Sequence, residues 1–205
     1  MFTSVRSLVP LAIMAAAASS VAATPVKVWA RSDVLTTFTS NFTLAAFNTT
    51  LPNANLTGAP LVLGSGGAID GESFQVTSTY AFYPLDEYPS LGLVEGNLRA
   101  FLSDGGWFTN ATAPLSGNAL GWVTSSFYSD PASTAFSAIW IDDTQPYAIL
   151  AVNGVSNLWS LCPSDAPRAG QNTLYFNATT IPSQSGVSGA SPIECYPVKV
   201  NMVPV

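Results

Sequence analysis

Short apolar stretches separated by turn residues recur along most of the chain. Near the C-terminus, for example, Val198, Val200 and Met202 are separated by single polar residues. A period of two places such side chains on one face of a β-strand. Comparable stretches predict further strands at 41–47, 61–63, 74–82, 91–94, 98–102, 107–110, 119–128, 135–141, 147–152, 155–161 and 172–176.

No segment after residue 23 shows the 3.6-residue periodicity of an amphipathic helix. The strands recur about every 8–12 residues with turn residues between them, which is typical of an all-β domain. We therefore expect residues 24–205 to form one all-β domain of about ten short antiparallel strands. A closed barrel, a trefoil and a sandwich all fit this spacing. Closure into a barrel would remove the open strand edges, which are prone to aggregate and which few lysines are available to protect. The sequence has no clean internal repeat, which weakens the trefoil interpretation.

The most apolar stretch outside the first residues is 135–162. Asn153-Gly154 lies between two apolar runs and suits a type I′ turn, in which both central residues need positive φ. The segment therefore predicts a three-strand meander that carries Trp140, Trp159 and Cys162.

Two glycine-containing segments predict turns. Glu95-Gly96-Asn97 lies between two strands and predicts a tight hairpin. Gly64-Ser65-Gly66-Gly67 superficially resembles a nucleotide-binding loop, but neither a lysine nor a helix follows it. We therefore expect a flexible turn that ends the strand at 61–63.

The first residues have the features of a secretory signal peptide. A basic start, Met1–Arg6, precedes an apolar run, Leu8–Ala18, and small residues at Val21-Ala22-Ala23. This order predicts a signal peptide at 1–23 and a secreted, extracellular or cell-wall location. No other segment approaches the roughly 18 apolar residues of a membrane-spanning helix, so no span is expected.

Composition agrees with an extracellular protein. Only 9% of the residues are charged and the net charge is −6, with the basic residues dispersed, so we expect no nucleic-acid partner.

The two cysteines, Cys162 and Cys195, predict one disulfide in an oxidising compartment. Five sequons predict N-glycosylation at Asn41, Asn48, Asn55, Asn110 and Asn177.

The chain contains no histidine. This excludes Ser-His-Asp and Cys-His catalysis and most zinc sites. Carboxylates could still support a glycoside hydrolase, or calcium binding, and Asp142-Asp143 is the sharpest candidate pair. Its neighbours favour a plain turn, because Thr144-Gln145-Pro146 follows it. The other candidate carboxylates are Asp86, Glu87, Glu95 and Asp104. We therefore predict no catalytic residue, no metal ligand and no cofactor.

Aromatic residues offer a binding hypothesis, because sugars stack their apolar faces on exposed rings. Trp122, Trp140 and Trp159 lie in apolar strands and are expected in the core. Trp107 follows a glycine turn, and Tyr83 and Tyr88 lie in a loop with Pro84 and Asp86. We therefore expect Trp107, Tyr83 and Tyr88 to be the exposed aromatics of a carbohydrate-binding surface, if the protein has one.

Several segments together resemble a known group of proteins. They are Phe42–Ala46, Ala59–Gly64, the strand Trp159-Ser160-Leu161-Cys162-Pro163 and the terminal Glu194-Cys195-Tyr196-Pro197-Val198. This arrangement resembles fungal secreted cell-wall proteins of the phialide-protein (PhiA-like) and IgE-binding-protein type. The resemblance implies a secreted or cell-wall protein without known catalysis and gives no catalytic residue to transfer. We expect a non-enzymatic glycoprotein whose possible partner is a cell-wall polysaccharide; a lectin and a carboxylate-only glycoside hydrolase are the alternatives.

Overall fold

The computed structural model describes residues 34–125, 132–141, 145–164, 170–183 and 190–205. These residues form strands and turns without a helix, which confirms the all-β prediction. Within them there is accordingly no helix with the length and hydrophobicity for a membrane crossing. The expected signal peptide and Asp142-Asp143 lie outside the described residues. The strands are β1 (Val34–Leu35), β2 (Phe42–Asn48), β3 (Ala59–Ile69), β4 (Glu72–Thr79), β5 (Ser90–Val94), β6 (Asn97–Phe101), β7 (Trp107–Ala111), β8 (Gly121–Ser125), β9 (Phe136–Ile139), β10 (Ala148–Val152), β11 (Trp159–Cys162), β12 (Thr173–Phe176), β13 (Thr180–Ile181), β14 (Ile193–Glu194) and β15 (Tyr196–Pro204).

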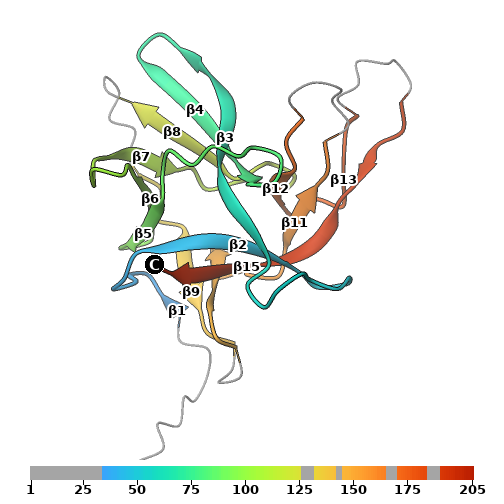
Figure 1. Cartoon of the computed structure of the whole chain (residues 1–205), viewed down its shortest axis with the longest axis horizontal. Coiled ribbons are helices and arrows are strands. Elements are labelled where there is room, and N and C mark those ends of the chain that lie inside the picture. Colours follow the sequence, from blue (N-terminus) through green and yellow to red (C-terminus); the bar gives the residue numbers. More distant parts are fainter. Residues whose placement is uncertain (1–33, 126–131, 142–144, 165–169, 184–189) are drawn as a thin grey trace, which may run out of the picture.

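Antiparallel pairing closes the main sheet into a barrel. From β2 it runs through β5, β6, β7, β8, β4, β12, β11 and β15 and returns to β2, which makes a closed barrel of nine strands. Of the three architectures that fit the spacing, the barrel is the observed one. β3 pairs with β2 at one end and forms a long hairpin with β4 that projects from the body in Figure 1. β10, β9 and β1 extend the sheet from β15.

The barrel is closed by the longest pairing between distant segments. β2 pairs with β15 along its whole length, from Phe42 opposite Pro204 to Asn48 opposite Val198. The predicted apolar face of β15 is buried, with Val200 and Met202 fully enclosed. Asn201 is buried as well, and its Nδ2 donates to the carbonyl oxygen of Thr57 at 2.9 Å. The other edge of β15 is shared, since β10 pairs with its C-terminal half and β11 with its first residues.

This arrangement corrects the predicted three-strand meander. β9 and β10 pair as expected, but β11 pairs with β15 and β12 and not with β10. The Asn153-Gly154 turn is confirmed, with φ values of 51° and 77°. β15 occupies the position beside β10 that the meander would have given to β11. The indole Nε1 of Trp159 still joins the two segments, because it donates to the carbonyl oxygen of Leu150 at 2.8 Å.

The glycine-rich segment after residue 63 is also different from the prediction. It does not end the strand, because β3 continues through it to Ile69. A β-bulge between Ser65 and Gly67 absorbs the irregularity, and Gly67 has φ of 113°, which glycine adopts without strain. The predicted hairpin turn at Glu95-Gly96 is confirmed, with φ values of 50° and 79°.

One large hydrophobic core joins the barrel strands with β9 and β10. Trp122 and Trp159 are buried as predicted, and Trp140 is half-buried and packs against the same core. Trp122 donates from Nε1 to the buried hydroxyl of Thr77 at 2.9 Å, so its polar atom is satisfied inside the barrel. The other largest fully buried side chains are Phe42, Leu44, Leu93, Leu98, Leu120, Phe136, Ile149, Leu150, Leu161 and Leu174.

The predicted disulfide between Cys162 and Cys195 is confirmed. It continues the β11–β15 pairing, since the neighbouring residues Leu161 and Tyr196 lie opposite each other. Cys162 forms a small second cluster with Ala178 and Ile181, against which the ring of Tyr175 packs. Burial raises the pKa of the Tyr175 hydroxyl, which therefore stays protonated well beyond neutral pH.

Replacing both cysteines by alanine should destabilise the protein without changing its fold. The bridge spans 33 residues, and in the chain-entropy model a loop of that length contributes about 3–4 kcal/mol. Urea unfolding followed by tryptophan fluorescence should show this loss, and reduction of the unaltered protein should lower stability by a similar amount. An unchanged free energy of unfolding in the double variant would contradict a stabilising role for the bridge.

Candidate functional site

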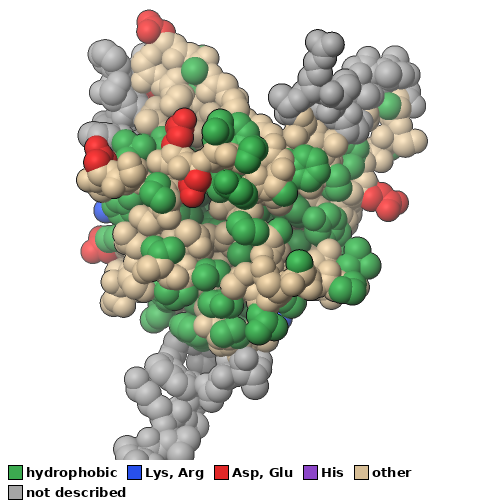
Figure 2. All heavy atoms as spheres, viewed as in Figure 1, with side chains coloured by type: hydrophobic (Ala, Val, Ile, Leu, Met, Phe, Trp, Pro, Cys, Tyr) green, Lys and Arg blue, Asp and Glu red, His purple; other side chains and the backbone are tan. Residues whose placement is uncertain are grey.

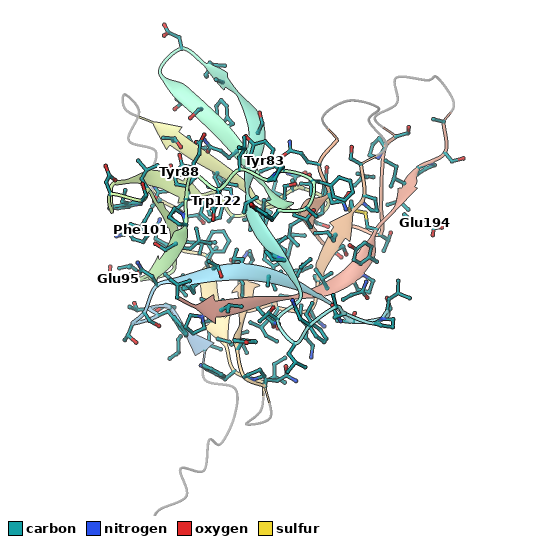
Figure 3. All side chains as sticks on the ribbon, in the orientation of Figure 1. Tyr83, Tyr88, Glu95, Phe101, Trp122 and Glu194 are labelled. Carbon is teal, nitrogen blue, oxygen red and sulfur yellow. A yellow bond between two sulfur atoms is a disulfide. The ribbon has the colours of Figure 1, made fainter. Side chains whose placement is uncertain are left out.

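The three aromatic residues expected at the surface do not share one environment. Trp107 begins β7 and is 37% exposed. Tyr83 and Tyr88 are half-buried in the loop between β4 and β5, and Figure 3 shows them at separate places along it. The most exposed aromatics of that loop are Tyr80 and Phe82, at 46% and 55%. The strand predicted at 74–82 included both residues, whereas β4 ends at Thr79.

Tyr88 reaches into the barrel through its hydroxyl. The Oγ1 of the buried Thr109 donates to this hydroxyl at 3.1 Å and lies 2.6 Å from Oγ1 of Thr124. Thr124 in turn donates to Oε1 of Gln75 at 3.3 Å. These bonds tie the loop to β7, β8 and β4, so the structure gives Tyr88 an anchoring contact and does not display its hydroxyl beside Trp107.

Trp107 belongs to a different group, on the outer face of β6 and β7. Leu98 and Ala100 of β6 are fully buried, so the alternate residues Arg99 and Phe101 point outward. Phe101 lies directly opposite Trp107, after a register shift in the β6–β7 pairing. The centre of the Arg99 guanidinium lies 3.8 Å from the centroid of the Trp107 ring, so a cation covers one face of that ring.

Glycine at position 92 allows Phe101 to lie against the sheet. A Cβ built on Gly92 would come within 2.8 Å of Cε2 of Phe101 and 3.9 Å of Oδ1 of Asn41. Any larger residue there would push the ring away. Figure 3 shows Phe101 beside β5 and β6, apart from the enclosed Trp122.

Two asparagines flank the cation. Asn97 is 3% exposed, and its Oδ1 accepts a hydrogen bond from Nε of Arg99 at 2.9 Å. Asn110 lies opposite Arg99 on β7. Nδ2 of Asn97 and Oδ1 of Asn110 are buried atoms without a hydrogen-bond partner among the described residues. We call Asn97, Arg99, Phe101, Trp107 and Asn110 the Arg99 cluster.

The described carboxylates are spread over several turns and strands. Asp86 and Glu87 lie in the β4–β5 loop, Glu95 in the β5–β6 turn and Asp104 in the β6–β7 turn, and these four are exposed. The others are Asp70 in the β3–β4 turn, the half-buried Glu72 that begins β4, and Glu194 in β14. Figure 2 shows single acidic groups scattered among hydrophobic and uncharged polar side chains. Within the described part of the chain, no group of three or more His, Cys, Asp or Glu residues could hold a metal ion.

Two sequons form Asx turns at the loop between β2 and β3. Asn48 is the half-buried last residue of β2, and Asn55 is exposed within the loop. Oδ1 of Asn48 accepts hydrogen bonds from the backbone nitrogen and the hydroxyl of Thr50, at 2.8 and 3.0 Å. Asn55 binds Thr57 in the same way, at 3.1 and 2.9 Å. The oxygen of each asparagine carries these bonds, and its Nδ2 donates to no described residue.

The other sequons lie in more restricted places. Asn41 and Asn177 are exposed, but their Nδ2 atoms donate to the hydroxyls of Ser90 and Ser116 at 3.4 and 2.7 Å. Asn110 is half-buried inside β7, between β6 and β8. A glycan on Asn110 would have to leave the middle of a paired strand.

Comparison with known proteins adds no identity, because neither a family model nor a curated protein matches the chain. The PhiA-like resemblance therefore stays a hypothesis.

We expect glycan occupancy in the secreted, folded protein to follow this geometry. Asn48 and Asn55 should be almost fully occupied, because they lie at the end of β2 and in the exposed loop after it, and their Nδ2 atoms bond no described residue. Asn110 should be the least occupied, because a glycan there would disturb the β6–β7 pairing. Enzymatic deglycosylation in ¹⁸O-labelled water followed by peptide mass spectrometry measures each site. Full occupancy at Asn110 together with unmodified Asn48 and Asn55 would refute this order.

Proposed function

We propose that the chain is a secreted, N-glycosylated barrel protein that resides at the cell wall or in the extracellular matrix and acts without catalysing a reaction. The observation that carries the proposal is the pair of sequon Asx turns at Asn48, which ends β2, and at Asn55, in the exposed loop that follows. The disulfide and the secretory features of residues 1–23 support the same compartment.

The chemistry of the side chains supports a non-catalytic role. The three hydrogen-bonded hydroxyls of Tyr88, Thr109 and Thr124 have no imidazole to activate them as nucleophiles, since the chain lacks histidine. A glycoside hydrolase needs two carboxyl groups across one bond, within about 10 Å of each other. Asp86 and Glu87 are adjacent in one exposed loop, and the other described carboxylates are spread over other turns and strands, which favours binding over hydrolysis.

Expression of the full chain with its leader in a yeast host tests this proposal. The protein should leave the cell, divide between the medium and the wall fraction, and lose mass on treatment with an endoglycosidase. The N48Q/N55Q variant should lose most of that mass difference. Retention of an unglycosylated chain inside the cell would refute the proposal, and so would turnover of chitin, β-glucan or mannan that Asp→Asn variants abolish.

Carbohydrate binding at the Arg99 cluster is a second candidate function. It is favoured by the partly exposed ring of Trp107 opposite Phe101, with hydrogen-bonding groups beside both. Aromatic rings with neighbouring amides and a cation are the groups that bind sugar rings and their hydroxyls.

Trp107→Ala should remove at least roughly nine-tenths of the retention of the protein on its insoluble polysaccharide, because the stacking surface is lost. Pull-down on chitin, β-glucan and mannan measures this retention. Phe82→Ala is the matched control, since Phe82 is an exposed aromatic in the β4–β5 loop, outside the Arg99 cluster. Both variants should unfold at the temperature of the unaltered protein within a few degrees. Equal retention of the two variants would exclude this face.

A further inference from the structure

We infer that the Arg99 cluster binds a carboxylate-bearing saccharide, a uronic acid unit, with the Arg99 guanidinium as the carboxylate-binding group. The inference rests on the carbohydrate-binding candidate above and assigns the chemical class of its ligand. Three features support it: among the described residues the guanidinium lacks an anion, two amide atoms lack hydrogen-bond partners, and the aromatic rings provide an apolar surface.

Arg99 has no anionic partner in the described structure. No ion pair joins it to a described carboxylate, and Asp104 in the adjacent turn uses Oδ1 to accept the backbone N–H of Gly106 at 2.8 Å. The guanidinium is nevertheless fixed, by Asn97 at Nε and by the ring of Trp107. A held guanidinium with its terminal N–H groups free is suited to bind a carboxylate with two parallel hydrogen bonds.

The amides beside Arg99 require both a donor and an acceptor. Nδ2 of Asn97 lacks an acceptor, and Oδ1 of Asn110 lacks a donor. Buried polar atoms are normally paired, and leaving one unpaired is costly. Both atoms are enclosed in the free protein. A sugar hydroxyl can both donate and accept, so hydroxyls of one ring could satisfy them once the two asparagine side chains turn toward the surface.

The aromatic residues add an apolar surface. The Arg99 guanidinium covers one face of the Trp107 ring, and Phe101 lies opposite Trp107 against Gly92. The apolar face of a sugar ring could pack on this surface. A phosphate would use the cation alone, and a neutral sugar would leave the guanidinium without an anion, whereas a uronic acid uses all three features.

The net negative charge of the molecule opposes binding of acidic polymers. At a net charge of −6 the chain repels polyanions at long range, so retention on an acidic polysaccharide requires a local site. Lys199 on β15 is the other basic residue in the described part of the chain and provides a matched control.

The experiment is affinity electrophoresis of the full, secreted protein in gels that contain polygalacturonate or its methyl ester. The acidic polymer should slow the unaltered protein, and esterification or added salt should relieve the effect. Arg99→Gln should weaken retention roughly ten-fold or more, because it removes the charge and the paired donors. Arg99→Lys should recover only part of it, and Lys199→Gln should behave like the unaltered protein.

The Asn110 sequon needs its own control. Thr112→Ala abolishes the sequon and leaves Asn110 in place, whereas Thr112→Ser preserves it. If a glycan on Asn110 covers the cluster, only Thr112→Ala should increase retention on polygalacturonate. Thermal unfolding of every variant shows that the barrel is intact.

The outcomes separate this inference from the function on which it rests. Retention on neutral polysaccharides that Trp107→Ala abolishes, without any preference for polygalacturonate over its ester, would overturn the role of Arg99 and leave carbohydrate binding standing. Retention on neither kind of polymer would overturn both. Retention on polygalacturonate that is equal in Arg99→Gln and the unaltered protein would place the acidic site elsewhere and refute the inference.

Discussion

The pairing of β2 with β15 is the constraint on which the other elements depend. It joins two strands separated by most of the chain, from Phe42 opposite Pro204 to Asn48 opposite Val198. Bringing such distant segments together costs loop-closure entropy, and ladder hydrogen bonds and burial of Val200 and Met202 offset that cost. Once this pair has formed, β3 and β5 have an edge on β2, and β10 and β11 have one on β15.

Local rules predicted two hairpin turns and the buried apolar faces, but not which strands are neighbours. Glu95-Gly96 and Asn153-Gly154 were predictable because a two-residue turn depends on its own φ preferences. The apolar face of β15 was predictable for the same local reason. The position of β15 between β10 and β11 depends on a partner far away in sequence. The continuation of β3 through Gly64–Gly67 depends on β4, whose pairing a glycine-rich composition does not reveal.

The candidate site was predictable only in part. Trp107 was identified from the glycine turn before it, which is a local signal. Its neighbours Arg99 and Phe101 come from the preceding strand, and a register shift decides which of them faces the indole. The role of Tyr88 depends on Thr109 and Thr124, from two other strands. The local sequence around Trp107 therefore indicated an aromatic residue near a turn. Only the sheet register showed that Arg99 and Phe101 lie beside it.

The place of β15 in the sheet also has a consequence for biosynthesis. Because this strand pairs with β2, β10 and β11, the barrel cannot be completed until residues 196–204 have been translated. Until then, apolar strands such as β10 lack a neighbour and could associate with other chains. If the chain is secreted and glycosylated as proposed, sugars added early at Asn48, which ends β2, and at Asn55, in the loop that follows, would enlarge and solubilise the incomplete barrel. The sequons would then assist folding as well as carry glycans on the folded protein.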